Sequence, residues 1–253
     1  MFNFFVLPEN RRGDVFTITG GDYNHLKNVL RMNIGDRFLV SCEGSSHLCS
    51  LKELTEDTAL AELIQENYQD TELPIQIYLF QGLPKSDKLE WILQKGVELG
   101  VHTFIPVETK RSIVKIEPRK KDQKQSRWQA IAESAAKQSK RTVIPTVHPA
   151  TAFDKAISLA KELDVIFVPY ENKEGMSATK EALQTLKPGM KVGIFIGPEG
   201  GFEPAEIEAL QEADAHILSL GKRILRTETA AVTAVSMVML YTETEIGYES
   251  PAQ

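Results

Sequence analysis

Hydrophobic and polar residues follow one pattern in the first seventy residues and another in the rest of the chain. Residues 22–32 place apolar side chains at helical spacing, and Asp22 or Asn24 is available as the residue that caps this helix. Three short, partly alternating segments follow, at residues 37–42, 47–51 and 59–64. Because turn-forming residues separate them, they are typical of strands. The pattern predicts a small β-rich barrel domain over residues 1–70, closed by a polar stretch.

After Pro74 the pattern changes to strands that alternate with helices. Six apolar runs are expected to be strands: residues 75–80, 102–107, 143–147, 164–168, 191–196 and 215–220. Six segments are expected to be helices: residues 86–99, 126–140, 151–163, 178–186, 203–212 and 228–242. Ser86 is positioned to cap the first of these helices, Gly100 to end it, and Pro204 to occupy the first turn of a later one. The alternation predicts a mostly parallel sheet with helices on both faces.

Composition places the chain among ordinary globular proteins. It has 253 residues, of which 42% are hydrophobic, and contains no apolar run long enough to span a bilayer. Cys42 and Cys49 fit no zinc or redox spacing, and the histidines are scattered, so no metal site is expected. The N-terminus has neither the basic lead nor the apolar stretch of a signal peptide. These features favour a cytoplasmic protein.

Charge is unevenly distributed along the chain. The whole sequence carries a net charge of −6, whereas residues 110–127 hold eight basic residues against Glu117 and Asp122. That segment therefore carries a net charge of +6, and the remainder of the chain carries a net charge of −12. Such segregation can create an anion-binding face on an acidic protein, although a solvated loop and helix face would have the same composition.

Three expected strands end in chemically unusual segments, at residues 168–171, 196–202 and 220–228. Ligands of open α/β sheets bind beyond the carboxyl ends of the strands. The glycines of the second segment allow a ligand to approach the backbone closely, although the same glycines would suit a tight strand–helix connection. The segment is not a phosphate-binding P-loop, because no Gly-Lys-Ser/Thr follows.

The third segment runs with Lys222, Arg223 and Arg226 into the apolar helix 229–240. Cations at a helix N-terminus oppose the helix dipole, so this placement indicates an anionic partner. The alternatives are surface charges, or an ion pair between Arg226 and Glu228. The helix is apolar on nearly every side, which predicts a central core position or an interface.

Five segments in order resemble the RsmE family of the SPOUT superfamily. Two are the glycine-rich strand ends, Ile196-Gly197-Pro198-Glu199-Gly200-Gly201-Phe202 and Leu220-Gly221-Lys222-Arg223-Ile224-Leu225-Arg226-Thr227-Glu228-Thr229-Ala230. The others are His25-Leu26-Lys27-Asn28-Val29-Leu30-Arg31, Lys95-Gly96-Val97-Glu98-Leu99-Gly100 and Gln138-Ser139-Lys140-Arg141. The chain departs from the family at Asn3, where an arginine is usual.

The resemblance implies an α/β fold with a PUA-like RNA-binding domain over residues 1–70 and a SPOUT methyltransferase domain with a deep trefoil knot over residues 73–246. It also implies a homodimer through the C-terminal helix. The implied cofactor is S-adenosyl-L-methionine, with no metal. The residues expected to hold the cofactor are Pro169, Tyr170, Ile196, Gly197, Gly200, Gly201, Leu220, Gly221, Ile224, Leu225, Arg226, Thr229 and Ala230.

The implied reaction is methylation of N3 of a uridine in 16S ribosomal RNA of the small subunit. Arg226 is the expected catalytic cation, because it would stabilise the uridine anion, and Glu228 is expected to accept the proton or to orient Arg226. Tyr170 or Phe202 is available to stack on an unpaired base. The expected RNA-contacting residues are Arg31, Arg111, Lys115 and Arg141.

Three other functions remain open at this level. A SPOUT enzyme with another target, such as a tRNA ribose 2′-O position, would share the cofactor motifs. A non-catalytic RNA-binding assembly factor would share the fold. A nucleotide-binding enzyme would use Gly200 and Gly201 on a phosphate, but the missing P-loop lysine argues against it.

Overall fold

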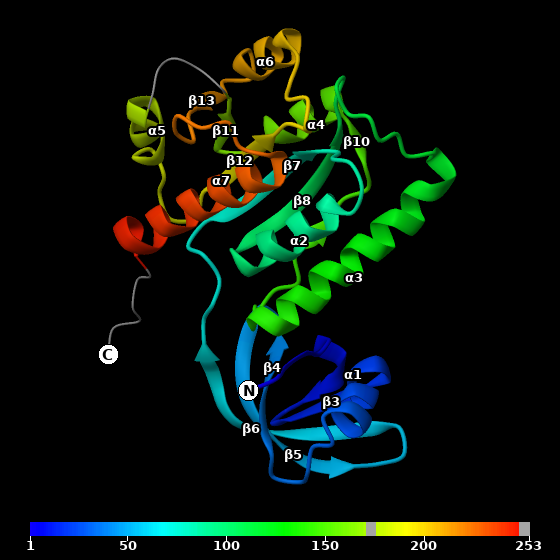
Figure 1. Ribbon diagram of the computed structural model, residues 1–253. Coiled ribbons are helices and arrows are strands. Elements are labelled where there is room, and N and C mark those ends of the chain that lie inside the picture. Colours follow the sequence, from blue (N-terminus) through cyan, green and yellow to red (C-terminus); the bar gives the residue numbers. More distant parts are fainter. Residues whose placement is uncertain (171–175, 248–253) are drawn as a thin grey trace. The chain divides into compact units, whose positions relative to one another are not determined.

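A computed structural model describes residues 1–170 and 176–247 and divides the chain into two compact units (Figure 1). The first unit is Met1–Glu72 with Ala136–Ile144, and the second is Leu73–Ala135 with Pro145–Gln253. The division after Glu72 lies close to the predicted boundary. The return of residues 136–144 to the first unit was not predicted. Glu171, the last residue of one strand-end segment, lies outside the described residues.

The first unit is built on a six-stranded sheet. Its order is β1 (Asn3–Phe5), β4 (Arg37–Cys42), β5 (Ser45–Leu54), β6 (Thr58–Gln69), β3 (Val15–Thr19) and β2 (Arg11–Arg12). Only β1 and β4 pair in parallel, and the other neighbours are antiparallel. A short 3-10 helix, Pro8–Asn10, precedes β2. Phe4, Phe16, Leu26 and Phe38 are fully buried in the core of this unit.

The predicted helix of the first unit differs from the observed one. The observed helix begins earlier than the predicted one, as α1 (Gly20–Asn24), and continues as a π-helical turn, His25–Val29. Thr19 precedes α1, so the cap predicted for Asp22 or Asn24 does not form. Asp22 instead forms an ion pair of 2.7 Å with Lys137.

The second unit contains the predicted parallel sheet. Its order is β10 (Thr151–Ala152), β8 (Val101–Glu108), β7 (Gln76–Gly82), β12 (Lys191–Ile196), β11 (Val165–Pro169) and β13 (His216–Leu218). A further strand, β9 (Thr146–Val147), pairs with β8. Every one of these pairings is parallel, so all these strands end at the same edge of the sheet.

Helices cover both faces of this sheet, as predicted (Figure 1). They are α2 (Lys88–Glu98), α3 (Lys121–Ser139), α4 (Phe153–Ala160), α5 (Met176–Leu183), α6 (Pro204–Gln211) and α7 (Thr227–Tyr241). A 3-10 turn, Pro118–Lys120, precedes α3, and a π-helical turn, Thr242–Ile246, follows α7. Residues of α4 and α6 share a core with Phe80 and Phe195, whose rings stack at 4.2 Å. Helices α2 and α7 pack on each other against β8 and β12. No helix of the described residues is long and apolar enough to cross a membrane.

Helix boundaries follow local chemistry at some positions and not at others. Glu203 and Glu206 form a capping box around Pro204, and Gly100 ends α2 with a φ of +91°, both as the sequence predicts. Ser86 does not cap α2, because it adopts a left-handed φ of +57° and the helix starts after Asp87.

Arg141 has a structural role in the first unit, which replaces the predicted phosphate contact. Its residue exposure is 3%, and its Nε donates to both carboxylate oxygens of Glu72 at 3.0 Å. The amides of Thr142 and Val143 donate to the same carboxylate at 2.9 and 3.3 Å. Burial by itself would raise the pKa of Glu72, but the bond and charge of Arg141, with these two amides, lower it overall.

The carbonyl oxygen of Arg141 accepts a hydrogen bond from Nδ2 of Asn3 at 3.0 Å. Asn3, which stands where the family usually has an arginine, also accepts one from the hydroxyl of Ser41 at 3.0 Å. Asn3 is 4% exposed. The departure from the family motif is therefore a buried hydrogen-bonding position in this protein.

We expect Arg141→Met to lower the free energy of unfolding by about 3–5 kcal/mol, because it leaves the carboxylate of Glu72 buried without its cation. Urea unfolding at pH 7 measures this, with Arg119→Met as an exposed control. Since the folded-state pKa of Glu72 is lowered, the stability it contributes is present above its unfolded pKa of about 4.3 and is lost as the pH falls further. A variant as stable as wild type would contradict the structural role.

Candidate functional site

The loops that follow the parallel strands are joined to one another by hydrogen bonds and ion pairs. They begin after Gly82, Glu108, Pro169, Ile196 and Leu218, at the carboxyl edge of the sheet. This is the edge at which open α/β sheets bind ligands. The contacts between these loops define the candidate site.

A neutral bridge joins the end of β7, the first residue of α7 and the loop after β12. Nε2 of Gln81 donates to the hydroxyl of Thr227 at 2.9 Å, and that hydroxyl donates to the carbonyl of Gly197 at 2.6 Å. Nε2 of Gln81 also donates to the carbonyl of Gly82 at 2.9 Å. Gln81 and Thr227 are both buried. The bridge fixes the start of α7 against the glycine-rich loop.

An ionic bridge runs beside it. Nζ of Lys88, in the first turn of α2, lies 3.0 Å from Glu199 and 3.2 Å from Glu228. The amide of Lys85 donates to Glu199 at 3.1 Å. Hydrogen bonds to Glu199 and then to Glu228 raise the pKa of Lys88, so it remains charged at neutral pH. Within the described residues, Glu228 thus meets the cation of Lys88, and the alternative of an ion pair between Arg226 and Glu228 is not observed there.

Close backbone approach explains several glycines of the site. A Cβ on Gly82 would lie 2.7 Å from the ring of Pro198, and one on Gly197 would lie 3.1 Å from Gly201. Gly201 and Gly221 have φ of +67° and +104°, and a Cβ built on either would meet open space. The first pair therefore keeps the loops in contact, while the second pair leaves backbone accessible beside them.

Arg111 joins the basic segment to the glycine-rich loop. Its Nη1 donates to the carbonyl of Gly200 at 2.9 Å, and its Nε lies 3.9 Å from Glu203. The amide of Lys110 donates to Glu206 at 2.9 Å. The basic segment, predicted only as an anion-binding face, thus has one end at the strand-end loops.

Other residues of the basic segment are already paired. Lys121 lies 2.9 Å from Glu108, and Arg127 lies 2.8 Å from Glu90. Lys115 is exposed and lines a hollow of about 350 Å³ with Glu108, Thr109 and Ser112. In the first unit Arg31 is exposed and has a φ of +52°.

The loop before α7 is fixed at one end and exposed at the other. The hydroxyl of Thr179 on α5 donates to the carbonyl of Ser219 at 2.9 Å, and the amide of Ser219 donates back to it. Ile224 is 84% exposed, an unusual value for a large apolar side chain. Arg226 is exposed and occupies the N-cap position of α7, which begins one residue earlier than the helix predicted over residues 228–242.

The two aromatic candidates differ in exposure. Phe202 is 3% exposed and packs in the core beside Phe153, so the prediction that it stacks on a base is wrong. Tyr170 is 36% exposed, and its amide donates to the carbonyl of Leu218 at 3.0 Å. Thr229 is exposed and Ala230 half-buried in the first turns of α7.

Known protein families match both units. A family described as RNA methyltransferase domain matches residues 71–239, and one described as RNA methyltransferase PUA domain matches residues 18–64. The Bacillus subtilis protein named ribosomal RNA small subunit methyltransferase E is 42% identical over 232 residues, 90% of this chain and 91% of that protein. This chain belongs to the ribosomal RNA small subunit methyltransferase E (RsmE) family.

Other family members agree with this assignment. The Aquifex aeolicus protein of the same name is 30% identical, over 91% of this chain and 96% of that protein. A crystal structure of the Neisseria gonorrhoeae enzyme bound to S-adenosyl methionine has a TM-score of 0.79 at 31% identity, covering 95% of this chain and 97% of that one. The predicted combination of a PUA-like domain and a SPOUT-type methyltransferase domain is confirmed for this RsmE-family chain.

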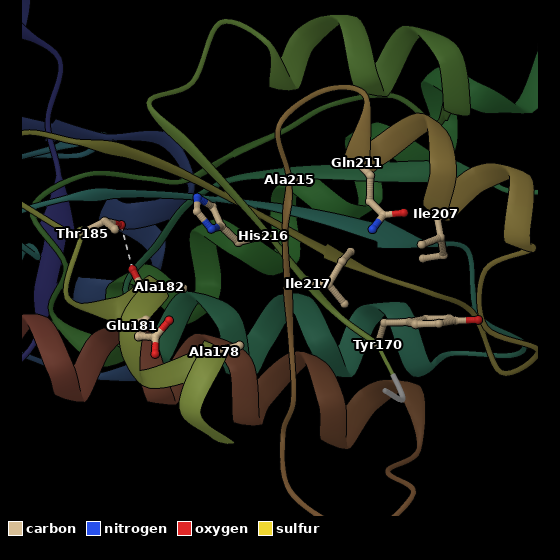
Figure 2. A pocket seen from close by; sticks show the side chains of 10 residues that line it. All are labelled: Tyr170, Ala178, Glu181, Ala182, Thr185, Ile207, Gln211, Ala215, His216 and Ile217. Atoms are coloured by element: carbon tan, nitrogen blue, oxygen red, sulfur yellow. Dashed lines mark hydrogen bonds between the residues drawn. The ribbon is translucent and has the colours of Figure 1, made fainter. Parts of the chain in front are cut away.

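A cavity of about 610 Å³ lies beside the edge strand β13 (Figure 2). Figure 2 shows side chains of α5 on one side of it and of α6 on the other. The cavity is lined by Tyr170, Ala178, Glu181, Ala182, Thr185, Ile207, Gln211, Ala215, His216 and Ile217. Tyr170 is its one residue in common with the residues expected to hold the cofactor. The cavity is therefore distinct from the bridged loops, which we take as the functional site of this RsmE-family protein.

Gln81, Lys88 and Thr227 carry the bridges of the site. Sequence reasoning gave Gln81 and Thr227 no role of their own, and residues 85–88 resemble a charged helix cap, with a contact to cofactor or RNA as the alternative. Gln81 is a lone polar residue at the end of an apolar strand, which is a usable signal for a site residue at the sheet edge. Lys88 looks like an ordinary helix-start charge, and its two partners are more than a hundred residues away in sequence. The described residues include no cluster of three or more His, Cys, Asp or Glu that could hold a metal ion.

Proposed function

We propose that this protein methylates N3 of a uridine in 16S ribosomal RNA, within the small ribosomal subunit, with S-adenosylmethionine as the methyl donor. Its family gives the class of activity, S-adenosylmethionine-dependent rRNA methylation. The observation that carries the proposal is the hydrogen bond that joins Thr227, the residue after Arg226, to Gly197 of the glycine-rich loop. We place this reaction in the cytoplasm.

The strand-end loops fit the cofactor. Gly201 and Gly221 leave open space where a side chain would otherwise stand. The holding residues we propose are those predicted from sequence: Pro169, Tyr170, Ile196, Gly197, Gly200, Gly201, Leu220, Gly221, Ile224, Leu225, Arg226, Thr229 and Ala230. When bound, S-adenosylmethionine supplies a methyl group on a sulfonium, an activated donor that needs no metal.

The chain's own task is to make uridine N3 nucleophilic. N3 carries a proton at neutral pH, so the uridine anion has to be stabilised and its proton removed. Arg226 is the proposed catalytic cation, since a fixed guanidinium beside the uracil oxygens stabilises negative charge on the ring. Its exposed side chain at the N-cap of α7 is available to a base from solution.

Glu228 is the proposed proton acceptor. It is the second residue of α7, and Nζ of Lys88 lies 3.2 Å from its carboxylate. The contact with Lys88 fixes the position of this carboxylate beside the start of α7. This contact leaves Arg226 outside the ion pair and available to the substrate.

RNA contacts are proposed for exposed cations of both units. In the second unit the proposed contacts are Arg111, which is hydrogen-bonded to Gly200 of the glycine-rich loop, and Lys115 of the same basic segment. In the PUA-like unit the proposed contact is Arg31. N3 takes part in base pairing, so the target base must be unpaired or flipped out. Tyr170 is the proposed stacking partner, because its ring is partly exposed.

The target atom is tested by nucleoside mass mapping. Small subunits from cells lacking this protein are incubated with purified protein and S-adenosylmethionine, and we expect one 3-methyluridine to appear in 16S rRNA. Naked 16S rRNA is the parallel substrate, which we expect to react more slowly. A methyl group on ribose, or on tRNA, would overturn the N3 assignment, and no methylation with intact cofactor binding would favour a non-catalytic assembly factor.

We expect Arg226→Ala to lower kcat by about 10²–10³-fold, because it removes the cation that stabilises the uridine anion, with the dissociation constant of S-adenosylmethionine changed less than about threefold. Single-turnover methylation and calorimetry measure the two quantities. Arg223→Ala is the matched control, since Arg223 is exposed in the same loop. Wild-type turnover in Arg226→Ala would remove Arg226 from the mechanism.

We also propose the trefoil knot and a homodimer through α7, two further features of this assignment. In support of the dimer, α7 keeps apolar side chains on the side away from its own sheet: Leu240 is 54% exposed, and Val232, Met237 and Met239 are half-buried. In support of the knot, the loop 219–226 is hydrogen-bonded to Thr179 of α5 at its first residue, and Thr227, which follows the loop, is hydrogen-bonded to Gly197.

Leu240→Glu is expected to shift the protein from dimer to monomer at micromolar concentration, because it places a charge in the proposed apolar interface. Sedimentation velocity over a concentration series measures the shift. Leu7→Glu is the control, since Leu7 is similarly exposed but belongs to the first unit. A Leu240→Glu dimer as tight as wild type would exclude this face of α7 as the interface.

A further inference from the structure

Gln81 has a buried amide oxygen for which the described residues offer no hydrogen-bond partner. The residue is 1% exposed and ends the apolar run of β7, paired in register with Ile196. Its Nε2 donates to the carbonyl of Gly82 and to the hydroxyl of Thr227. Because a carbonyl oxygen can only accept, the nitrogen must be the atom that faces Gly82, and the orientation of the amide is fixed. Oε1 is the acceptor left over.

A buried acceptor without a donor destabilises a fold by about 1–3 kcal/mol and is rare in native structures. This one lies in the neutral bridge of the site. Thr227 links the Gln81 amide to the carbonyl of Gly197, so two hydrogen bonds separate Gln81 from the glycine-rich loop. An acceptor at this depth, on the carboxyl edge of the sheet, is placed for a small ligand seated among the strand-end loops.

We propose that Oε1 of Gln81 accepts a hydrogen bond from an N–H donor of bound S-adenosylmethionine, which makes Gln81 a cofactor-binding residue. This inference rests on the proposed function. The cofactor carries two such donors, the ammonium of its methionine part and the amino group of its adenine. A bond from the ammonium would be charge-assisted and therefore the stronger of the two.

The test compares Gln81→Met with Thr227→Val, with calorimetric titration of S-adenosylmethionine into full-length protein. Gln81→Met removes the free acceptor, the bond to Gly82 and one bond of the bridge, whereas Thr227→Val removes both bonds of the bridging hydroxyl and leaves Oε1 in place. We expect the dissociation constant to rise about tenfold or more in Gln81→Met and clearly less in Thr227→Val. If Gln81 acts only through the bridge, Thr227→Val weakens binding at least as much, and that order of effects would overturn the inference.

The two donors are separated by repeating the titrations with 5′-methylthioadenosine, which keeps the adenine and lacks the ammonium. A penalty in Gln81→Met that persists with this ligand assigns the bond to the adenine amino group, and one that disappears assigns it to the ammonium. Urea midpoints report whether each variant is folded. Should Gln81→Met not fold, Gln81→Asn withdraws the amide by one methylene and is expected to show the same excess over Thr227→Val.

Failure of the inference can be told from failure of the proposed function. Wild-type protein that does not bind S-adenosylmethionine contradicts the proposed cofactor itself. Wild-type protein that binds it, with a dissociation constant unchanged in Gln81→Met, overturns the role of Gln81 alone.

Discussion

The hydroxyl of Thr227 holds the candidate site together. The carbonyl of Gly197 follows a buried strand directly, and such a carbonyl must find a donor or destabilise the fold. Thr227 supplies that donor and accepts from Gln81 in turn. A hydroxyl donates and accepts at one oxygen atom, so β7, the β12 loop and α7 can meet at this single atom. The position of α7, and with it everything attached to its first turn, follows from this contact.

Two neighbouring residues of α7 bind the same loop by different chemistry. Thr227 reaches Gly197 by a neutral hydrogen bond, and Glu228 reaches Glu199 through Lys88. The neutral contact is buried and insensitive to salt, whereas the ionic contact is partly exposed and is screened by salt. Arg226 comes directly before this pair, so its backbone is fixed although its side chain is free to meet a substrate. A fixed backbone limits the positions that this guanidinium can reach, which under the proposed mechanism would lower part of the cost of reorganisation when charge develops on the reacting base.

Sequence reasoning succeeded where the cause is local. Pro204 at a helix start and Gly100 at a helix end are set by their own backbone preferences, and the strand–helix alternation follows from residues close in sequence. It failed where the partner is distant. Arg141 reads as a free cation at a helix end until Glu72 is found beside it, and Phe202 reads as a ligand-side aromatic until its core neighbours are known. The motif match singled out the strand-end loops that these contacts join, but no pattern within one segment encodes a bridge such as Gln81–Thr227–Gly197.

In an acidic protein that acts on RNA, the position of each basic side chain matters more than the number of basic side chains. At a net charge of −6, long-range attraction to a polyanion is absent, and the basic segment is partly neutralised by Glu90 and Glu108. Arg111 is placed differently, because its guanidinium is held on the carbonyl of Gly200 at the glycine-rich loop. At physiological salt such a cation attracts a phosphate only when the two lie within about 10 Å of each other. Its contribution to the binding of RNA therefore depends on that distance and not on the charge of the whole chain. Under the proposed function, recognition would therefore depend on the fit of RNA to a few fixed positions around the loops, and a substrate already folded in a ribosomal particle would supply such a fit.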